Sequence, residues 1–178
     1  MNQRRSFLKS SVALASAIGM PALAKAAQAA PGERTLRLYN THTGESLRSV
    51  FWAEGQFIPD ALQDINKLLR DHRNNKIAEM DTKLIVLLNE VSTKFGDNQT
   101  LHIISGYRSP ESNAKLHANS SGVAKHSMHM DGKAIDIRLP GKDLAQLRKA
   151  AVSMRAGGVG YYPDSQFVHM DTGRVRYW

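Results

Sequence analysis

The sequence predicts a single α+β domain, with a small antiparallel sheet flanked by helices, behind a short N-terminal leader. The chain has 178 residues, of which 42% are hydrophobic, and this length suits one globular domain rather than two. Apolar residues recur at strand spacing in some segments and at helix spacing in others, and the two kinds of segment are interspersed without a repeat or linker. We therefore assign residues 1–29 to a leader and residues 30–178 to the domain.

The leader has the features of a twin-arginine export signal. Arg4 and Arg5 are followed by Phe-Leu and then by a run of small apolar residues over 11–23. This run is too short and too rich in alanine to anchor a helix across a bilayer, which takes about 20 strongly apolar residues. We predict cleavage before Ala30, with competing small-residue motifs within 22–26, and export to the periplasm. The alternative is an ordinary amphipathic helix.

The first part of the domain is predicted to form a hairpin followed by two helices. Residues 35–39 alternate apolar and polar side chains, and residues 45–51 form a second extended run after a polar turn. Helical spacing of apolar residues then predicts a helix that ends near Arg73. Asp81 is expected to cap a stronger helix that Gly96 ends. The apolar stripe of that helix consists of Leu84, Leu87, Leu88, Val91 and Phe95.

Shorter elements are predicted in the middle of the domain. Residues 101–104 form a strand that leads into a Ser-Gly pair. Pro110 begins a helix that extends to about His117, and Ser109 and Asn113 are expected to cap it. The polar residues 118–125 are predicted to form a loop.

The last third of the domain is predicted to contain two strands around a third long helix. Residues 133–138 are extended, and leucine, alanine and methionine mark a helix over 144–154. Gly157 and Gly158 end that helix, and residues 167–171 form the last strand.

Composition limits the chemistry that the domain can perform. The chain carries 24 lysines and arginines against 16 acidic residues, but four of the bases lie in the leader, which leaves +4 for the domain and predicts no nucleic-acid partner. The absence of cysteine excludes disulfides, thiolate zinc sites and cysteine nucleophiles, so a bound metal needs nitrogen and oxygen ligands. With no apolar run near 18 residues in the domain, we predict no membrane span.

Polar groups that a packed core has little reason to contain gather in residues 105–109, 126–136 and 167–171. In the second stretch His129 precedes Gly132, which permits a tight turn, and Asp136 follows in a strand among apolar neighbours. A carboxylate in such a place is costly unless a cation or several donors compensate it. In the third stretch the period of two places His169 and Asp171 on one face of the strand.

Two imidazoles and a carboxylate, with a fourth position left to water, suit a hydrolytic Zn²⁺ site. Our candidate ligands are His129, Asp136 and His169, which would hold one zinc ion per chain. Their spacing alone is weakly specific. A histidine near an apolar strand is more often a hydrogen-bonded structural residue, and Asp136 is also compatible with an ion pair to Arg138 or Arg108.

A resemblance adds to this interpretation. The order Ser-x-His129-x-x-Gly132-x-Ala-x-Asp136, preceded by Ser-Gly-Tyr-Arg-Ser and followed by Val-His-Met-Asp, resembles the zinc D-Ala-D-Ala metallopeptidases that share a fold with the hedgehog signalling domain. More closely, residues 36–46 and 153–163 and the terminal Arg-Tyr-Trp are similar to the murein endopeptidase K group. The twin-arginine leader also matches this group.

The resemblance implies a periplasmic zinc hydrolase that cuts peptide cross-links in peptidoglycan, with stem peptides as its partners. It places His129, Asp136 and His169 at the ligand positions, and Arg108 where an arginine contacts substrate and stabilises the oxyanion. The alternatives are a D-Ala-D-Ala carboxypeptidase and a catalytically silent zinc domain that binds peptidoglycan or a partner protein. The cleaved amide remains open among D-Ala to diaminopimelate, diaminopimelate to diaminopimelate, and terminal D-Ala.

One position departs from the wider family. Many members have a glutamate as general base three residues before the last histidine, where this chain has Gln166. Asp171 is our first candidate for the base, with orientation of a ligand histidine as its competing role. His126 is the second candidate, with a plain loop position as its alternative.

Overall fold

The fold is built on one eight-stranded mixed sheet with the strand order β3-β2-β1-β4-β5-β7-β6-β8. The structure is a computed structural model, and it describes residues 32–120 and 122–178. The predicted leader therefore lies outside the described residues. The strands are β1 (Arg34–Asn40), β2 (Ser46–Ala53), β3 (Gln56–Phe57), β4 (Leu101–Ser105), β5 (Ala134–Arg138), β6 (Gly158–Tyr162), β7 (Phe167–Asp171) and β8 (Arg176–Tyr177).

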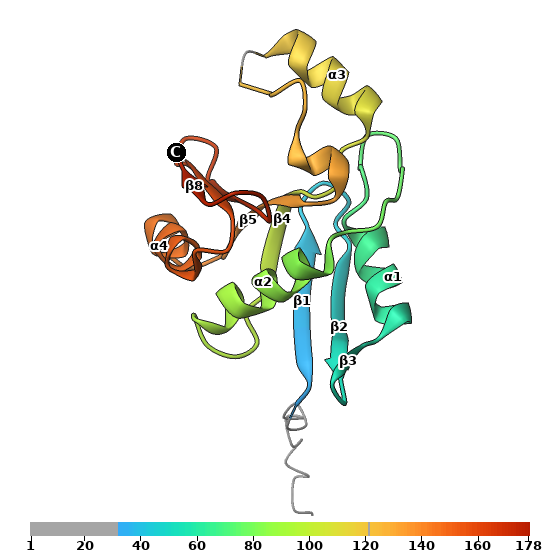
Figure 1. The fold of residues 1–178 in the computed structure, drawn as a ribbon, viewed down its shortest axis with the longest axis vertical. Helices are drawn as coiled ribbons and strands as arrows, with labels where there is room; N and C mark the ends of the chain where they lie inside the picture. The colour runs from blue at the N-terminus through green and yellow to red at the C-terminus, as the bar shows by residue number, and fades with distance from the viewer. Residues whose placement is uncertain (1–31, 121) are drawn as a thin grey trace, which may run out of the picture.

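Four α-helices and one 3-10 turn connect these strands in the described part of the chain. They are α1 (Pro59–Leu68), α2 (Thr82–Thr93), α3 (Pro110–Asn119), η1 (Met128–Asp131) and α4 (Leu144–Met154). The helices α1, α2 and α4 contact sheet strands, whereas α3 extends beyond one end of the sheet, close to η1 (Figure 1). No helix in the described ranges has the length and apolar character needed to cross a membrane.

The predicted α+β class is confirmed, but the sheet is larger than predicted and is not wholly antiparallel. β1 pairs with β4 in parallel, and so does β6 with β8. The segment between β1 and β4 contains two helices, and such a crossover can return the chain in the same direction. Alternation of apolar side chains predicts a strand but carries no information on the direction of its partner.

The predicted helix after Asp81 supplies much of the core. The Asp81 side chain accepts a hydrogen bond from the backbone N–H of Lys83 at 2.9 Å, which caps α2 as expected. Leu84, Leu88 and Val91, three members of the predicted stripe, are completely buried in the hydrophobic core. The fold therefore obtains its stability largely from packing of apolar side chains.

Several boundaries differ from the sequence prediction, two of them near the candidate site. α1 ends at Leu68 rather than near Arg73, because the Leu69 carbonyl accepts the Tyr107 N–H at 2.8 Å and the chain turns there. The segment after Met154 continues into strand β6, which its glycines had indicated only as a helix end. The short strands β3 and β8 were also not predicted.

Candidate metal centre

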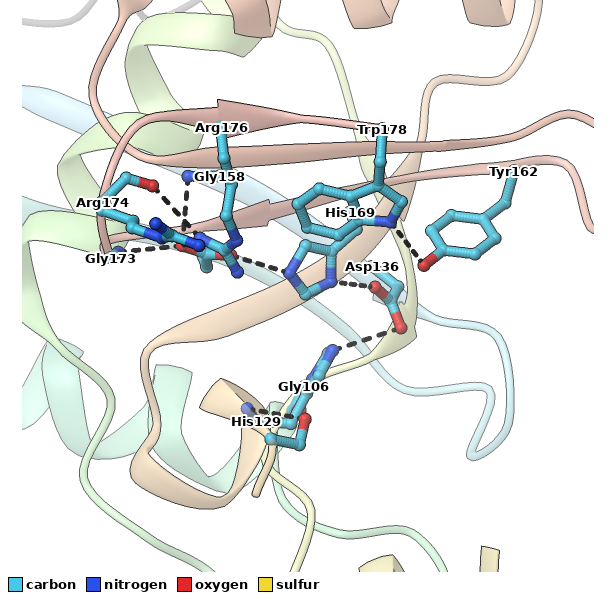
Figure 2. Close-up of polar contacts among 12 residues, drawn as sticks. Gly106, His129, Asp136, Gly158, Tyr162, His169, Gly173, Arg174, Arg176 and Trp178 are labelled. Carbon is cyan, nitrogen blue, oxygen red and sulfur yellow. Dashed lines mark hydrogen bonds and ion pairs between the residues drawn. The ribbon is translucent and has the colours of Figure 1, made fainter. Parts of the chain in front are cut away.

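The three predicted ligands meet at one point of the fold. His129 comes from η1, Asp136 from β5 and His169 from β7, and one ligand atom of each lies within 4.8 Å of the others. Figure 2 shows a nitrogen of each imidazole ring directed at the Asp136 carboxylate. His129 and Asp136 are buried and His169 is nearly so, with its side chain 12% exposed.

Strand register and a tight turn produce this convergence. Asp136 and His169 are directly opposite each other in the antiparallel β5–β7 pair, so their side chains share a face of the sheet. The Ser127 hydroxyl accepts the His129 N–H at 3.3 Å and caps the start of η1, and Gly132, with a left-handed φ of 65°, follows its last residue. A Cβ at Gly132 would collide with the Glu79 carbonyl, so glycine is required there.

A backbone carbonyl orients the His129 ring. Nδ1 lies 2.7 Å from the carbonyl oxygen of Gly106, which can only accept a hydrogen bond, so Nδ1 carries the proton. In the neutral ring this leaves a lone pair on Nε2, which lies 3.4 Å from Oδ2 of Asp136. The lone pair therefore points to the place where the three side chains converge.

His169 lies between two carboxylates. Its Nε2 is 3.1 Å from Oδ2 of Asp171 and its Nδ1 is 2.9 Å from Oδ1 of Asp136. Burial alone lowers the pKa of His169, but hydrogen bonds and attraction from Asp136 and Asp171 outweigh it and raise the pKa to about 8. Burial likewise opposes ionisation of Asp136, yet the charges and hydrogen bonds of His129 and His169 hold its pKa well below its usual range.

Asp171 is completely buried behind His169. Its carboxylate accepts two hydrogen bonds from Arg176, at 2.7 and 3.0 Å, and one from each backbone N–H of Gly158 and Gly173, at 3.1 and 2.8 Å. Although burial raises the pKa of Asp171, its hydrogen bonds with His169, Arg176 and the two glycines lower it well below the usual range. The carboxylate is thus ionised and has its acceptor positions filled.

A cavity of about 450 Å³ opens in front of the three converging side chains. Arg108 and His126 both line it, together with the candidate ligands. Asp136 is the single acidic side chain among the described residues that line this cavity, and Asp171 does not reach it. Gln166 is exposed in the turn between β6 and β7 and does not line the cavity either.

Arg108 faces the cavity from the loop before α3. Its guanidinium donates to Oδ1 of Asn113 at 3.3 Å, and its Nε is buried with no hydrogen-bond partner. Burial lowers the pKa of Arg108, and the negative charge of Asp136 partly offsets this effect. The incomplete hydrogen bonding leaves donors on the guanidinium for a ligand carboxylate or carbonyl.

The end of α3 that faces this cavity is anchored by Ser109 and Asn113. The Ser109 hydroxyl accepts the Ser112 N–H at 3.2 Å, so the predicted cap at Ser109 is confirmed. Asn113 is buried and donates to the carbonyls of Ala124 and Lys125, at 3.1 and 3.0 Å. Asn113 thereby ties α3 to the loop that carries His126, itself an exposed residue.

Comparison with known proteins decides the family. The sequence model of the family described as "Peptidoglycan L,D-endopeptidase MepK" matches residues 28–178. The chain belongs to the peptidoglycan L,D-endopeptidase MepK family. The peptidoglycan L,D-endopeptidase MepK of Escherichia coli K12 is 45% identical over 177 residues, which cover 99% of this chain and 97% of that protein.

A second relative, the probable peptidoglycan L,D-endopeptidase MepK of Haemophilus influenzae, is 40% identical over 178 residues. The match covers 99% of this chain and 95% of that protein. No solved structure matches this chain. The resemblance to the murein endopeptidase K group that the sequence motifs indicated is therefore confirmed at the level of the family.

The sequence predicted the three residues that converge but not the residues that hydrogen-bond to them and orient them. Arg176 was noticed only as part of a terminal motif, and the backbone groups of Gly106, Gly158 and Gly173 carry no side-chain signature. The one available signal was the recurrence of glycine beside the polar strand ends, which is typical of close backbone approach.

Proposed function

We propose that this protein is a zinc-dependent endopeptidase that hydrolyses amide bonds in the peptide cross-links of peptidoglycan. The observation that carries the proposal is the orientation of the two imidazoles: Gly106 and Asp171 each hold one ring nitrogen, so that the other faces Asp136. Paired with family membership, this arrangement favours a metal hydrolase over a hydrogen-bonded structural cluster.

The donor set fits zinc. It contains two imidazole nitrogens and a carboxylate, which are the ligand types of hydrolytic zinc sites that keep a fourth position for water. One such group occurs in the described residues, consistent with one zinc ion per chain. When bound, zinc would lower the pKa of a water molecule to about 7 and polarise the scissile carbonyl.

Neighbouring residues orient the candidate ligands. Asp171, fixed by Arg176 and by two backbone N–H groups, holds the His169 ring so that Nδ1 faces the centre. We assign Asp171 this orienting role rather than that of general base, because its carboxylate is buried, has its acceptor positions filled and lies behind the imidazole.

Proton transfer then falls to His126. It lines the cavity three residues before His129, and the described lining residues include no acidic side chain apart from the candidate ligand Asp136. His126 accepts a proton from the attacking water and returns it to the amine leaving group. Arg108, on the same cavity, binds the peptide and offsets the negative charge that develops on the carbonyl oxygen.

The name of the relatives supports a proposal for the bond that is cut. They are described as L,D-endopeptidases, and of the three amides left open by the sequence, the link between two diaminopimelate residues is the one that both joins an L-configured to a D-configured carbon and lies inside a cross-link. A terminal D-Ala on diaminopimelate also forms an L,D amide, but its removal is a carboxypeptidase reaction. We assign that link as the substrate. Peptidoglycan is reached by export to the periplasm, for which the twin-arginine motif in the leader supplies the route.

Purified cell-wall sacculi provide the test. The zinc-loaded mature protein should release new muropeptides by loss of diaminopimelate-to-diaminopimelate cross-links, and EDTA should abolish this activity. His169→Ala serves as the matched inactive control. Zinc binding without any EDTA-sensitive product would support the catalytically silent binding domain instead, and release of D-alanine alone would support a carboxypeptidase. Failure to retain or regain near-stoichiometric zinc would end the proposal.

A further inference from the structure

The last residue of the chain forms part of the wall of the candidate active site. Trp178 lines the same cavity as the candidate ligands, and the centroid of its indole lies 5.4 Å from that of the His169 ring. The residue is nevertheless 45% exposed. A large aromatic surface is thus open to whatever enters the cavity.

The indole is held in place from several directions. Its Nε1 donates a hydrogen bond to the Tyr162 hydroxyl at 2.8 Å, as Figure 2 shows, and the Arg176 guanidinium lies 4.9 Å from the indole centroid. The backbone extends the parallel pairing of β8 with β6, because the Trp178 N–H donates to the Val159 carbonyl at 3.2 Å. An exposed side chain with this many constraints is ordered before a ligand arrives.

Gly160 makes room for the indole. Gly160 is directly opposite His169 in the β6–β7 pair. A Cβ at position 160 would lie 2.7 to 2.8 Å from three atoms of the Trp178 ring, closer than real Cβ contacts come. The ring is rigid and hydrogen-bonded, so any side chain at position 160 would displace it from its place beside His169.

We propose that Trp178 is a substrate-binding residue whose exposed indole surface packs against the aliphatic chain of the diaminopimelate residue next to the scissile amide, and that Gly160 is the positioning residue that permits this. This inference rests on the proposed function. Aliphatic C–H groups pack well on an aromatic face, while the charged ends of diaminopimelate stay available to Arg108 and solvent. The indole of Trp178 and the guanidinium of Arg108 together fix the position of the peptide relative to His169.

Steady-state cleavage of a soluble, diaminopimelate-linked muropeptide dimer by the zinc-loaded protein tests this inference. Trp178→Ala should raise KM by about tenfold or more, as loss of a buried aromatic anchor does, with a smaller change in kcat and unchanged zinc content. Gly160→Ala should reproduce the defect although the indole is still present. Tyr177→Ala is the matched control, since Tyr177 is a similarly exposed aromatic in β8 that does not line the cavity.

A double-mutant cycle separates this role from general loss of structure. If Gly160→Ala acts through the indole, it should have little further effect on KM in a Trp178→Ala background. If it damages the structure independently, the fold-changes in KM of the two substitutions should multiply in the double variant. Thermal unfolding of each variant shows whether it is folded at the assay temperature.

Intrinsic fluorescence gives a second measurement. The chain contains two tryptophans, so Trp52→Phe leaves Trp178 as the single reporter, and its emission should change on titration with the muropeptide dimer. Two results would overturn the role of Trp178 but not the proposed function. One is an active wild type whose KM is unchanged by Trp178→Ala. The other is Trp178 emission that does not change when the dimer is added to a protein that cleaves it. A wild type that neither binds nor cleaves the dimer would instead overturn the proposed function.

Discussion

Asp71 provides a test of how the loop before α3 is held together. Its side chain is completely buried and accepts hydrogen bonds from the N–H and the hydroxyl of Ser109, at 2.9 and 2.8 Å, and from the Arg73 N–H at 3.1 Å. Burial alone would raise the pKa of Asp71, but hydrogen bonds from Ser112, Ser109 and Arg73 lower it from 3.8 to about 2. Ser109 in turn follows Arg108 and caps α3.

The lowered pKa determines how much Asp71 contributes to the free energy of unfolding and how this contribution changes with pH. A pKa that falls from 3.8 in the unfolded chain to about 2 in the folded one corresponds to about 2 kcal/mol of unfolding free energy at neutral pH. As the pH falls, the unfolded chain takes up this proton first, so the contribution is complete well above pH 3.8 and is lost as the pH approaches 2. About half of it should be gone at pH 3.

Asp71→Asn should therefore destabilise the protein by about 2 kcal/mol at pH 7, because the amide keeps a single acceptor oxygen and places an N–H group against the donors of Ser109. Urea unfolding at pH 7 and at pH 3 measures this, and the difference between wild type and variant should shrink at the lower pH. Asp64→Asn, at an exposed position of α1, is the control for loss of one charge. An equal cost at both pH values, or none at pH 7, would refute the role assigned to the carboxylate.

Three further changes address the candidate metal centre. His169→Ala should abolish hydrolysis and zinc retention, measured by elemental analysis, while the circular dichroism spectrum stays native because the core is apolar; global unfolding would show that the metal is structural. His126→Ala should lower turnover by about 10²–10⁴ at unchanged zinc content, and an unaffected rate would exclude it as the base. Asp171→Asn should weaken zinc binding by about 10–100-fold in a chelator competition assay, with little change in the zinc-saturated rate; the reverse pattern would return it to the role of base.

Residues near one another in the sequence were the easiest to predict. The cap at Asp81 and the stripe of α2 follow from helical spacing, and the shared face of His169 and Asp171 follows from the period of a strand. The convergence of His129 and Asp136 with His169 rested on the family resemblance, because spacing alone specifies neither how β5 and β7 pair nor where η1 lies. The structure brings all three candidate ligands together.

The supporting contacts were not predictable because they depend on unpredicted strands and on backbone groups. β6 contains two glycines in five residues, a composition that weakens the signal of a strand. Because β6 was not predicted, nothing in the sequence places Gly158 or Arg176 beside Asp171. The sequence therefore predicts a free Asp171 carboxylate that could act as a base. The burial of Asp171 follows from tertiary structure alone.

The segment from β6 to the C-terminus contributes most of one side of the site. It supplies His169, the Asp171–Arg176 pair that orients it, and the indole of Trp178 beside it. The β5–β7 register places Asp136 opposite His169, and a shift of one residue would turn His169 to the opposite face of the sheet. Because Arg176 contacts both Asp171 and the indole, substitutions at these positions should be strongly non-additive. Orientation of the candidate ligand and the shape of the cavity wall are therefore two consequences of the same strand pairing.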